Sequence, residues 1–199
     1  PSSFAMLLRK HLENLRLSGV EQPDFERILE LKFSGAEERL LIIEIFGSGN
    51  IILCDKDRRI VQPYRTEVWK HRTLRAGEVY AYPPKKGADI RNLDLSYFMQ
   101  ALQGSPDLVR GLATNLNLGG PLAEEICARA SVQKSRVPAE LSDLELEAIL
   151  MSARGLFDQG PAPCIVYEDK KPVDVLPFDF KTHMLKKAKR FDSFNEALD

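Results

Sequence analysis

Apolar and polar positions alternate along short segments in the first third of the chain, and this pattern predicts β-strands. Leu29, Leu31 and Phe33 alternate with Glu30 and Lys32, which is the period of a strand with one face in water. Turn-forming residues separate the apolar segments. The predicted strands are residues 27–33, 39–46, 50–54 and 59–62. Strands joined by such short turns predict an antiparallel meander, which needs a second layer to cover its apolar face.

A helical period replaces this alternation at the start of the chain and after residue 93. Ser2 or Ser3 caps a first helix, and Gly19 is expected to end it. A capping box, Ser142 with Glu145, opens a helix that reaches about residue 158. The other predicted elements are helices at 94–103, 105–115 and 121–131, short strands at 162–167 and 173–178, and a final helix after residue 193. The predicted fold class is therefore α+β.

Composition narrows the function classes. The chain has 199 residues, of which 44% are hydrophobic and 29% charged, so a normal core is expected. It contains no apolar run of membrane-spanning length and no signal-peptide pattern. Its three cysteines are far apart and form no C-x-x-C pair. We therefore expect a cytoplasmic protein with no metal and no cofactor.

The net charge is −1, but the basic and acidic residues are unevenly distributed along the chain. Six Lys or Arg and one acid fall between residues 58 and 75, and five basic residues and no acid fall between 181 and 190. Each run is either a solvated face or part of one positive surface for nucleic acid. Trp69, Tyr80 and Tyr82 accompany the first run. They either pin a long loop to the sheet or stack on unpaired bases.

Two further stretches leave alternatives open. Glu26 and Arg27 stand at the entrance of the first predicted strand, as a solvated strand end or as a site. The run from Leu116 to Ile126 contains Gly-Gly-Pro and resembles a helix-hairpin-helix element, whose backbone N–H groups bind phosphate. Glu124 and Glu125, placed in the first turn of the following helix, oppose a phosphate there. A purely structural hairpin is the alternative.

A sheet layer followed by a helical hairpin domain resembles the formamidopyrimidine-DNA glycosylase architecture. Those enzymes use an N-terminal proline and a nearby Glu, and usually a Cys-ligated zinc finger. Here Pro1 is followed by Ser-Ser-Phe, and the three cysteines cannot build the finger. We therefore expect a protein that is not an enzyme. A glycosylase-like DNA-binding protein remains an alternative.

Longer stretches resemble the NFACT family of ribosome-associated quality-control factors, whose bacterial members are also labelled fibronectin-binding proteins. They are PSSFAMLLRKHL (1–12), QP with ERI (22–28), EIFG with NIIL (44–53), YR (64–65), LRAGEVY (74–80) and FDSFNEALD (191–199). The resemblance implies a glycosylase-like sheet domain at 1–90 whose first strands lie upstream, a helix-hairpin-helix-like domain at 91–160, and returning strands with the start of a coiled coil at 161–199. It also implies no glycosylase activity.

The resemblance further implies binding to large ribosomal subunits obstructed by peptidyl-tRNA, and recruitment of tRNA, alanyl-tRNA in bacteria, for tailing of the nascent chain. The family's tRNA-engaging Asp-Arg pair matches Glu26 and Arg27, with Glu in place of Asp. We expect phosphate contacts from eight further basic residues: Arg58, Arg59, Arg65, Lys70, Arg72, Arg75, Lys186 and Lys187. A surface fibronectin-binding protein is the remaining alternative.

Overall fold

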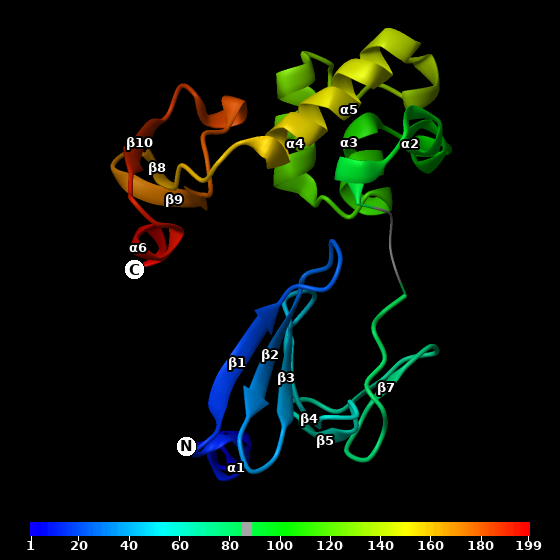
Figure 1. Cartoon of the computed structure of the whole chain (residues 1–199). Coiled ribbons are helices and arrows are strands. Elements are labelled where there is room, and N and C mark those ends of the chain that lie inside the picture. Colours follow the sequence, from blue (N-terminus) through cyan, green and yellow to red (C-terminus); the bar gives the residue numbers. More distant parts are fainter. Residues whose placement is uncertain (85–88) are drawn as a thin grey trace. The chain divides into compact units, whose positions relative to one another are not determined.

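The computed structural model of the chain describes residues 1–84 and 89–199, and it confirms the predicted α+β class with an antiparallel sheet (Figure 1). Internal contacts divide the chain into two compact units, Pro1–Lys85 and Lys86–Asp199. The domain boundaries expected after residues 90 and 160 remain predictions. None of the helices in the described ranges is long and apolar enough to cross a membrane.

The first unit is an antiparallel meander in the order β1-β2-β3-β4-β5. Its strands are β1 (Arg16–Glu21), β2 (Ile28–Ser34), β3 (Arg39–Glu44), β4 (Asn50–Asp55) and β5 (Ile60–Pro63). Helix α1 (Ser3–Leu12) precedes the sheet, and Ser2 caps it as one of the two expected residues. Two short strands, β6 (Glu67–Val68) and β7 (Thr73–Leu74), form a hairpin after β5.

The expected end of the first helix is wrong. Helix α1 ends at Leu12, and Asn14 then takes the left-handed conformation with φ of 64°, which asparagine tolerates better than most residues. Gly19 lies inside β1, beside a register shift in its pairing with β2. Strand β1 escaped prediction because nearly all its residues are exposed, so it shows no alternation of apolar and polar positions.

One apolar core cluster of the first unit lies on the face of the sheet that the segment after β5 covers. Ile28, Ile42 and Ile52 occupy this face on β2, β3 and β4, and all three are fully buried. Leu74 and Tyr80 pack against them from the segment after β5. Residues 64–82, which we call the covering loop, therefore supply part of the second layer that the meander requires.

The second unit begins with helices. They are α2 (Leu95–Leu102), α3 (Leu108–Arg110), α4 (Gly120–Ala130) and α5 (Asp143–Asp158), with a π-helical turn η2 (Gly111–Asn115) and 3₁₀ turns η1 (Ile90–Asn92) and η3 (Pro138–Glu140). The capping box of Ser142 and Glu145 opens α5 as predicted. The helix expected at 105–115 is wrong in form, because α3 gives way to the π-helical turn.

A small sheet of order β10-β8-β9 follows. Its elements are β8 (Cys164–Glu168), β9 (Lys171–Leu176), the 3₁₀ turn η4 (Lys181–His183) and β10 (Lys187–Arg190), and helix α6 (Phe194–Leu198) comes last. Strand β10 was not predicted as a strand, because its sequence is KAKR and all four residues are exposed. Lysines on an edge strand discourage pairing with other chains, which is a common use of charge at such positions.

Candidate nucleic-acid interface

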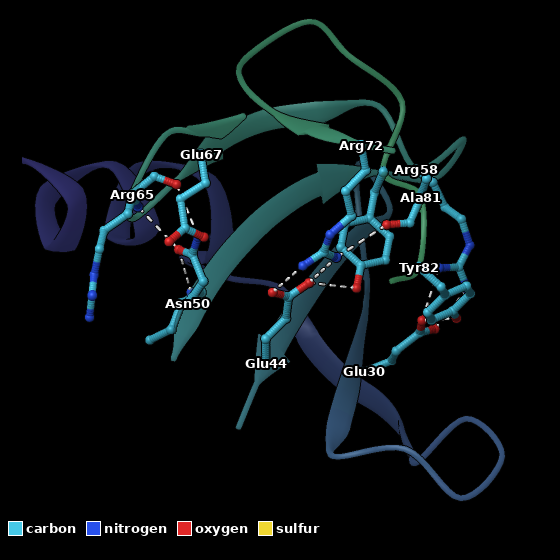
Figure 2. A network of polar contacts seen from close by, with 11 residues as sticks. Glu30, Glu44, Asn50, Arg58, Arg65, Glu67, Arg72, Ala81 and Tyr82 are labelled. Carbon is cyan, nitrogen blue, oxygen red and sulfur yellow. Dashed lines mark hydrogen bonds and ion pairs between the residues drawn. The ribbon is translucent and has the colours of Figure 1, made fainter. Parts of the chain in front are cut away.

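Three polar residues lie on the core face of the first sheet, where apolar residues are the rule. Glu30, Glu44 and Asn50 are only 2–3% exposed. Glu30 lies two residues after the buried Ile28 on β2, and Glu44 two residues after the buried Ile42 on β3. A buried carboxylate is costly unless a cation and hydrogen-bond donors meet it. Arginines outside the sheet strands meet both carboxylates (Figure 2).

Glu44 accepts a bidentate ion pair from Arg72 of the covering loop. The Arg72 nitrogens lie 2.6 and 2.9 Å from the two carboxylate oxygens, and the Tyr80 hydroxyl donates at 2.9 Å. The Arg72 side chain is 5% exposed. Burial would lower the pKa of Arg72, but the hydrogen bonds to Glu44 outweigh it and raise that pKa. Arg72 therefore stays protonated, and its ion pair with Glu44 fixes the middle of the covering loop on β3.

Glu30 is matched in the same way by Arg58, from the turn between β4 and β5. The two nitrogens of Arg58 lie 2.9 and 2.8 Å from the carboxylate oxygens, the Tyr82 hydroxyl also donates, and Arg58 stands over the Tyr82 ring at 5.1 Å. Burial raises the pKa of Glu30, but the hydrogen bonds from Arg58 and Tyr82 outweigh burial and hold that pKa below its usual value. Tyr82, the last residue of the covering loop, is thereby anchored at this second ion pair.

Asn50 fixes the beginning of the covering loop. Its Nδ2 donates to the Arg65 carbonyl at 2.9 Å and to Glu67 at 3.1 Å, and its Oδ1 accepts from the Arg65 N–H at 3.1 Å. The Arg65 guanidinium donates to the Ser48 carbonyl at 2.7 Å and lies over the Tyr64 ring. Three polar contacts along one face thus hold the loop at its start, middle and end.

Glu26 and Arg27 lie in the turn that leads into β2, beside the strand end that carries Glu44. The Arg27 carbonyl accepts from the Ile45 N–H at 2.8 Å, and Gln22 donates to the Glu26 carbonyl at 2.8 Å. These bonds place the backbone of the pair firmly at the β3 end. Arg27 is exposed, and its guanidinium has no ion-pair or hydrogen-bond partner within the described ranges.

The structure brings together only part of the predicted basic set. Arg65 and Arg72 lie with Arg27 at the end of the sheet marked by Glu44 and Asn50, and Lys70 belongs to the same hairpin as Arg72. We call this region the Arg27 end. Because Arg72 is buried in an ion pair, its guanidinium serves the fold, and we leave it out of the proposed phosphate contacts.

The other predicted basic residues lie elsewhere. Arg58 is bound to Glu30, Arg59 donates to the Gly77 carbonyl at 2.6 Å, and exposed Arg75 pairs with Glu78 at 2.9 Å. In the second unit, Lys186 pairs with Glu168 at 3.2 Å and Lys187 is exposed on β10.

The helical hairpin contains a residue that the sequence placed wrongly. Glu125 lies beyond the first turn of α4 and is fully buried. It accepts from Arg129 at 2.6 Å and from the backbone N–H groups of Lys181 and Thr182 at 2.8 and 3.0 Å. Burial raises the pKa of Glu125, but these donors outweigh it and lower that pKa. Glu125 therefore joins α4 to the η4 turn and does not face a ligand at the helix start.

The described residues offer neither a cluster of metal ligands nor, at Cys54 and Cys127, a reactive thiol. No group of three or more His, Cys, Asp or Glu residues there is placed to hold a metal ion. Burial is the main cause that raises the pKa of Cys54 to about 12 and that of Cys127 to about 11. Thiols with such pKa values carry almost no thiolate at neutral pH.

Known proteins are similar to this chain in sequence or in fold. The "Archaeal Rqc2 homolog aRqcH" of Methanocaldococcus jannaschii is 34% identical over 209 residues, which cover all of this chain and 31% of that protein. The human "Ribosome quality control complex subunit NEMF" is 28% identical over 228 residues, covering all of this chain and 21% of that protein. The chain thus spans less than a third of either relative.

A solved structure titled as the fibrinogen binding protein from Staphylococcus aureus superposes with a TM-score of 0.82 at 20% identity, covering the whole chain and 74% of that structure. At this identity it shows a shared fold. The family model described as "NFACT N-terminal and middle domains" matches residues 1–199. The resemblance seen in the sequence is therefore confirmed, and the chain belongs to the NFACT family.

Proposed function

We propose that this chain is the RNA-binding part of a ribosome quality control factor and is not an enzyme. In this proposal the factor binds large ribosomal subunits that carry peptidyl-tRNA, in the cytoplasm, and recruits tRNA, alanyl-tRNA in bacteria, for C-terminal tailing of the nascent chain. The names of the archaeal and human relatives support the quality-control role. The observation that carries the proposal is Arg27, an exposed cation with no ion-pair partner among residues 1–84 and 89–199, on a turn held by backbone hydrogen bonds.

The Arg27 end suits a phosphate backbone for two physical reasons. Guanidinium groups bind phosphate oxygens in a bidentate manner, and Arg27 pairs with no carboxylate in the described part of the chain. The covering loop next to it is held by three buried polar contacts. The backbone that carries Arg65 and Lys70 is therefore already ordered before RNA binds. Little ordering entropy is then lost when the RNA binds. Glu26, beside Arg27, is proposed to orient the tRNA through a base or ribose hydroxyl.

We propose that the basic residues away from the Arg27 end contribute less to RNA affinity. Arg59 and Arg75 remain candidates for peripheral phosphate contacts, but each already has a hydrogen-bond partner. In the second unit, Lys187 on β10 and Lys186 add positive charge. Exposed cations of this kind strengthen binding in a way that salt weakens.

Arg27→Ala is expected to weaken tRNA binding by about 10-fold or more, because a hydrogen bond to a charged group contributes about 1.5–3 kcal/mol. The slope of log K against log[salt] should also become shallower by about one, as expected for one lost phosphate contact. Both quantities follow from tRNA titrations at several salt concentrations. Arg9→Ala, which removes an exposed arginine of α1, is the matched control. Equal slopes for the two variants would contradict the proposal.

A further inference from the structure

The tip of the β6–β7 hairpin exposes an aromatic ring on a rigid base. The backbone N–H of Trp69 donates to the Arg72 carbonyl at 2.9 Å and closes the tip. The Arg72 guanidinium lies over the indole ring, 4.7 Å from its centroid, and is itself fixed to Glu44. Trp69 nevertheless remains 44% exposed and Val68 70% exposed. Arg72 thus supports one face of the ring and leaves much of the side chain in water.

Trp69 differs from the tyrosines that accompany it in the sequence. Tyr80 and Tyr82 each donate a hydroxyl hydrogen bond to a buried carboxylate, and Tyr80 is 4% exposed. These two rings therefore pin the covering loop, as one of the two sequence interpretations expected. The Trp69 indole N–H has no hydrogen-bond partner within the described part of the chain. Pinning the loop to the sheet thus explains both tyrosines and leaves the exposed part of Trp69 without a role.

The charges near the tip favour an anionic partner. Within residues 65–75, Arg72 and Arg75 are paired with Glu44 and Glu78, which leaves Arg65 and Lys70 with His71 against the single acid Glu67. Lys70 is exposed and has no partner among the described residues, and Glu67 is engaged by Asn50. An exposed indole flanked by cations is the arrangement that binds unpaired nucleotides, with stacking for the base and cations for the phosphates.

We propose that Trp69 is a stacking site for one unpaired RNA base, with Lys70 and Arg65 contacting the flanking phosphates. The inference rests on the proposed RNA-binding function and adds to it a position and a class of ligand. An RNA loop or single strand is the expected ligand, because a base inside a duplex offers no free face. Trp69 belongs to the same end of the sheet as Arg27, because the Arg27 carbonyl accepts from the N–H of Ile45, and Arg72, which lies over Trp69, is paired with the neighbouring Glu44.

The single tryptophan of the chain makes the test direct. A fluorescently labelled RNA hairpin with an unpaired loop, and a matched hairpin whose loop nucleotides are abasic, are titrated with the wild-type chain. Anisotropy of the label measures binding, and intrinsic fluorescence reports Trp69. We expect the loop RNA to quench Trp69 with the same midpoint as the anisotropy change. The abasic RNA should bind more weakly and leave Trp69 unquenched.

Variants supply a second measurement. Trp69→Ala is expected to weaken the binding of the loop RNA about 5- to 150-fold, the usual range for one stacked base. Trp69→Phe should keep most of the affinity. Equal quenching by the two RNAs, or equal affinities of wild type and Trp69→Ala, would overturn the stacking site while RNA binding stands. Binding of neither RNA by anisotropy would overturn both proposals. The comparison with the abasic RNA uses wild-type protein, so it tests the stacking site even if Trp69→Ala does not fold.

Discussion

Arg72→Ala is expected to destabilise the first unit by about 3–5 kcal/mol, the usual cost of removing one partner of a buried ion pair. Among the described residues, the substitution leaves the Glu44 carboxylate, which is 3% exposed, with the Tyr80 hydroxyl as its remaining hydrogen-bond donor. It also releases the middle of the covering loop. Urea unfolding followed by the fluorescence of Trp69 reports this unit selectively, because the chain has no other tryptophan.

Arg75→Ala is the control for this measurement. Arg75 belongs to the same loop and pairs with Glu78, but both side chains are largely in water, so the expected loss is at most about 1 kcal/mol. A variant with Glu44→Leu, Arg72→Met and Tyr80→Phe removes all three polar groups together and should recover much of the stability lost in Arg72→Ala. If Arg72→Ala costs no more than Arg75→Ala, the ion pair does not hold the loop.

Glu125→Ala is expected to destabilise the second unit by a similar amount, about 3–5 kcal/mol. The change removes the acceptor for Arg129 and for two backbone N–H groups of the η4 turn, Lys181 and Thr182. Hydrogen exchange of the amides of η4 and of α4 should accelerate. Glu124→Ala is the neighbouring control, because Glu124 is exposed and pairs with exposed Lys134, and its expected cost is at most about 1 kcal/mol.

The pH dependence gives a second check on Glu125. The pKa of Glu125 is lower in the folded chain than in the unfolded chain, where it is about 4.3. Its contribution to stability is therefore fully present above that unfolded value and is lost as the pH falls through the folded pKa. Glu125→Gln should lower the stability of the second unit at pH 7 and reduce its loss in acid. An unchanged acid transition in Glu125→Gln would show that Glu125 does not contribute as the structure indicates.

The sequence contained enough information for the elements whose local pattern matches their environment. Strands β2 to β5 alternate or carry apolar runs, and the Ser142 capping box starts α5 by contacts within four residues. Strands β1 and β10 had no such pattern, since they are exposed edges that exist through pairing with β2 and β8. Their existence depends on the neighbouring strand, which a local pattern does not include.

Part of the candidate site could be predicted from the sequence and part could not. The basic run at 58–75 is evident in the sequence. Its charge alone does not predict which of its arginines becomes buried. That depends on Glu30 and Glu44, which face the core two residues after buried isoleucines. Acidic residues in step with a buried apolar face, together with excess arginines in the next loop, are the signal that would have found these pairs. The role of Glu26 and Arg27 in tRNA binding stays a prediction.

Co-sedimentation with large ribosomal subunits that carry peptidyl-tRNA tests the central claim most directly. The intact protein is compared with its Arg27→Ala and Arg9→Ala variants at fixed salt, and both the bound factor and the recruited tRNA are measured. We expect Arg27→Ala to sediment with the subunit but to lose most of the recruited tRNA, while Arg9→Ala behaves as wild type. If Arg27→Ala folds, binds the subunit and retains tRNA at the wild-type level, the Arg27 end is not the tRNA-binding surface.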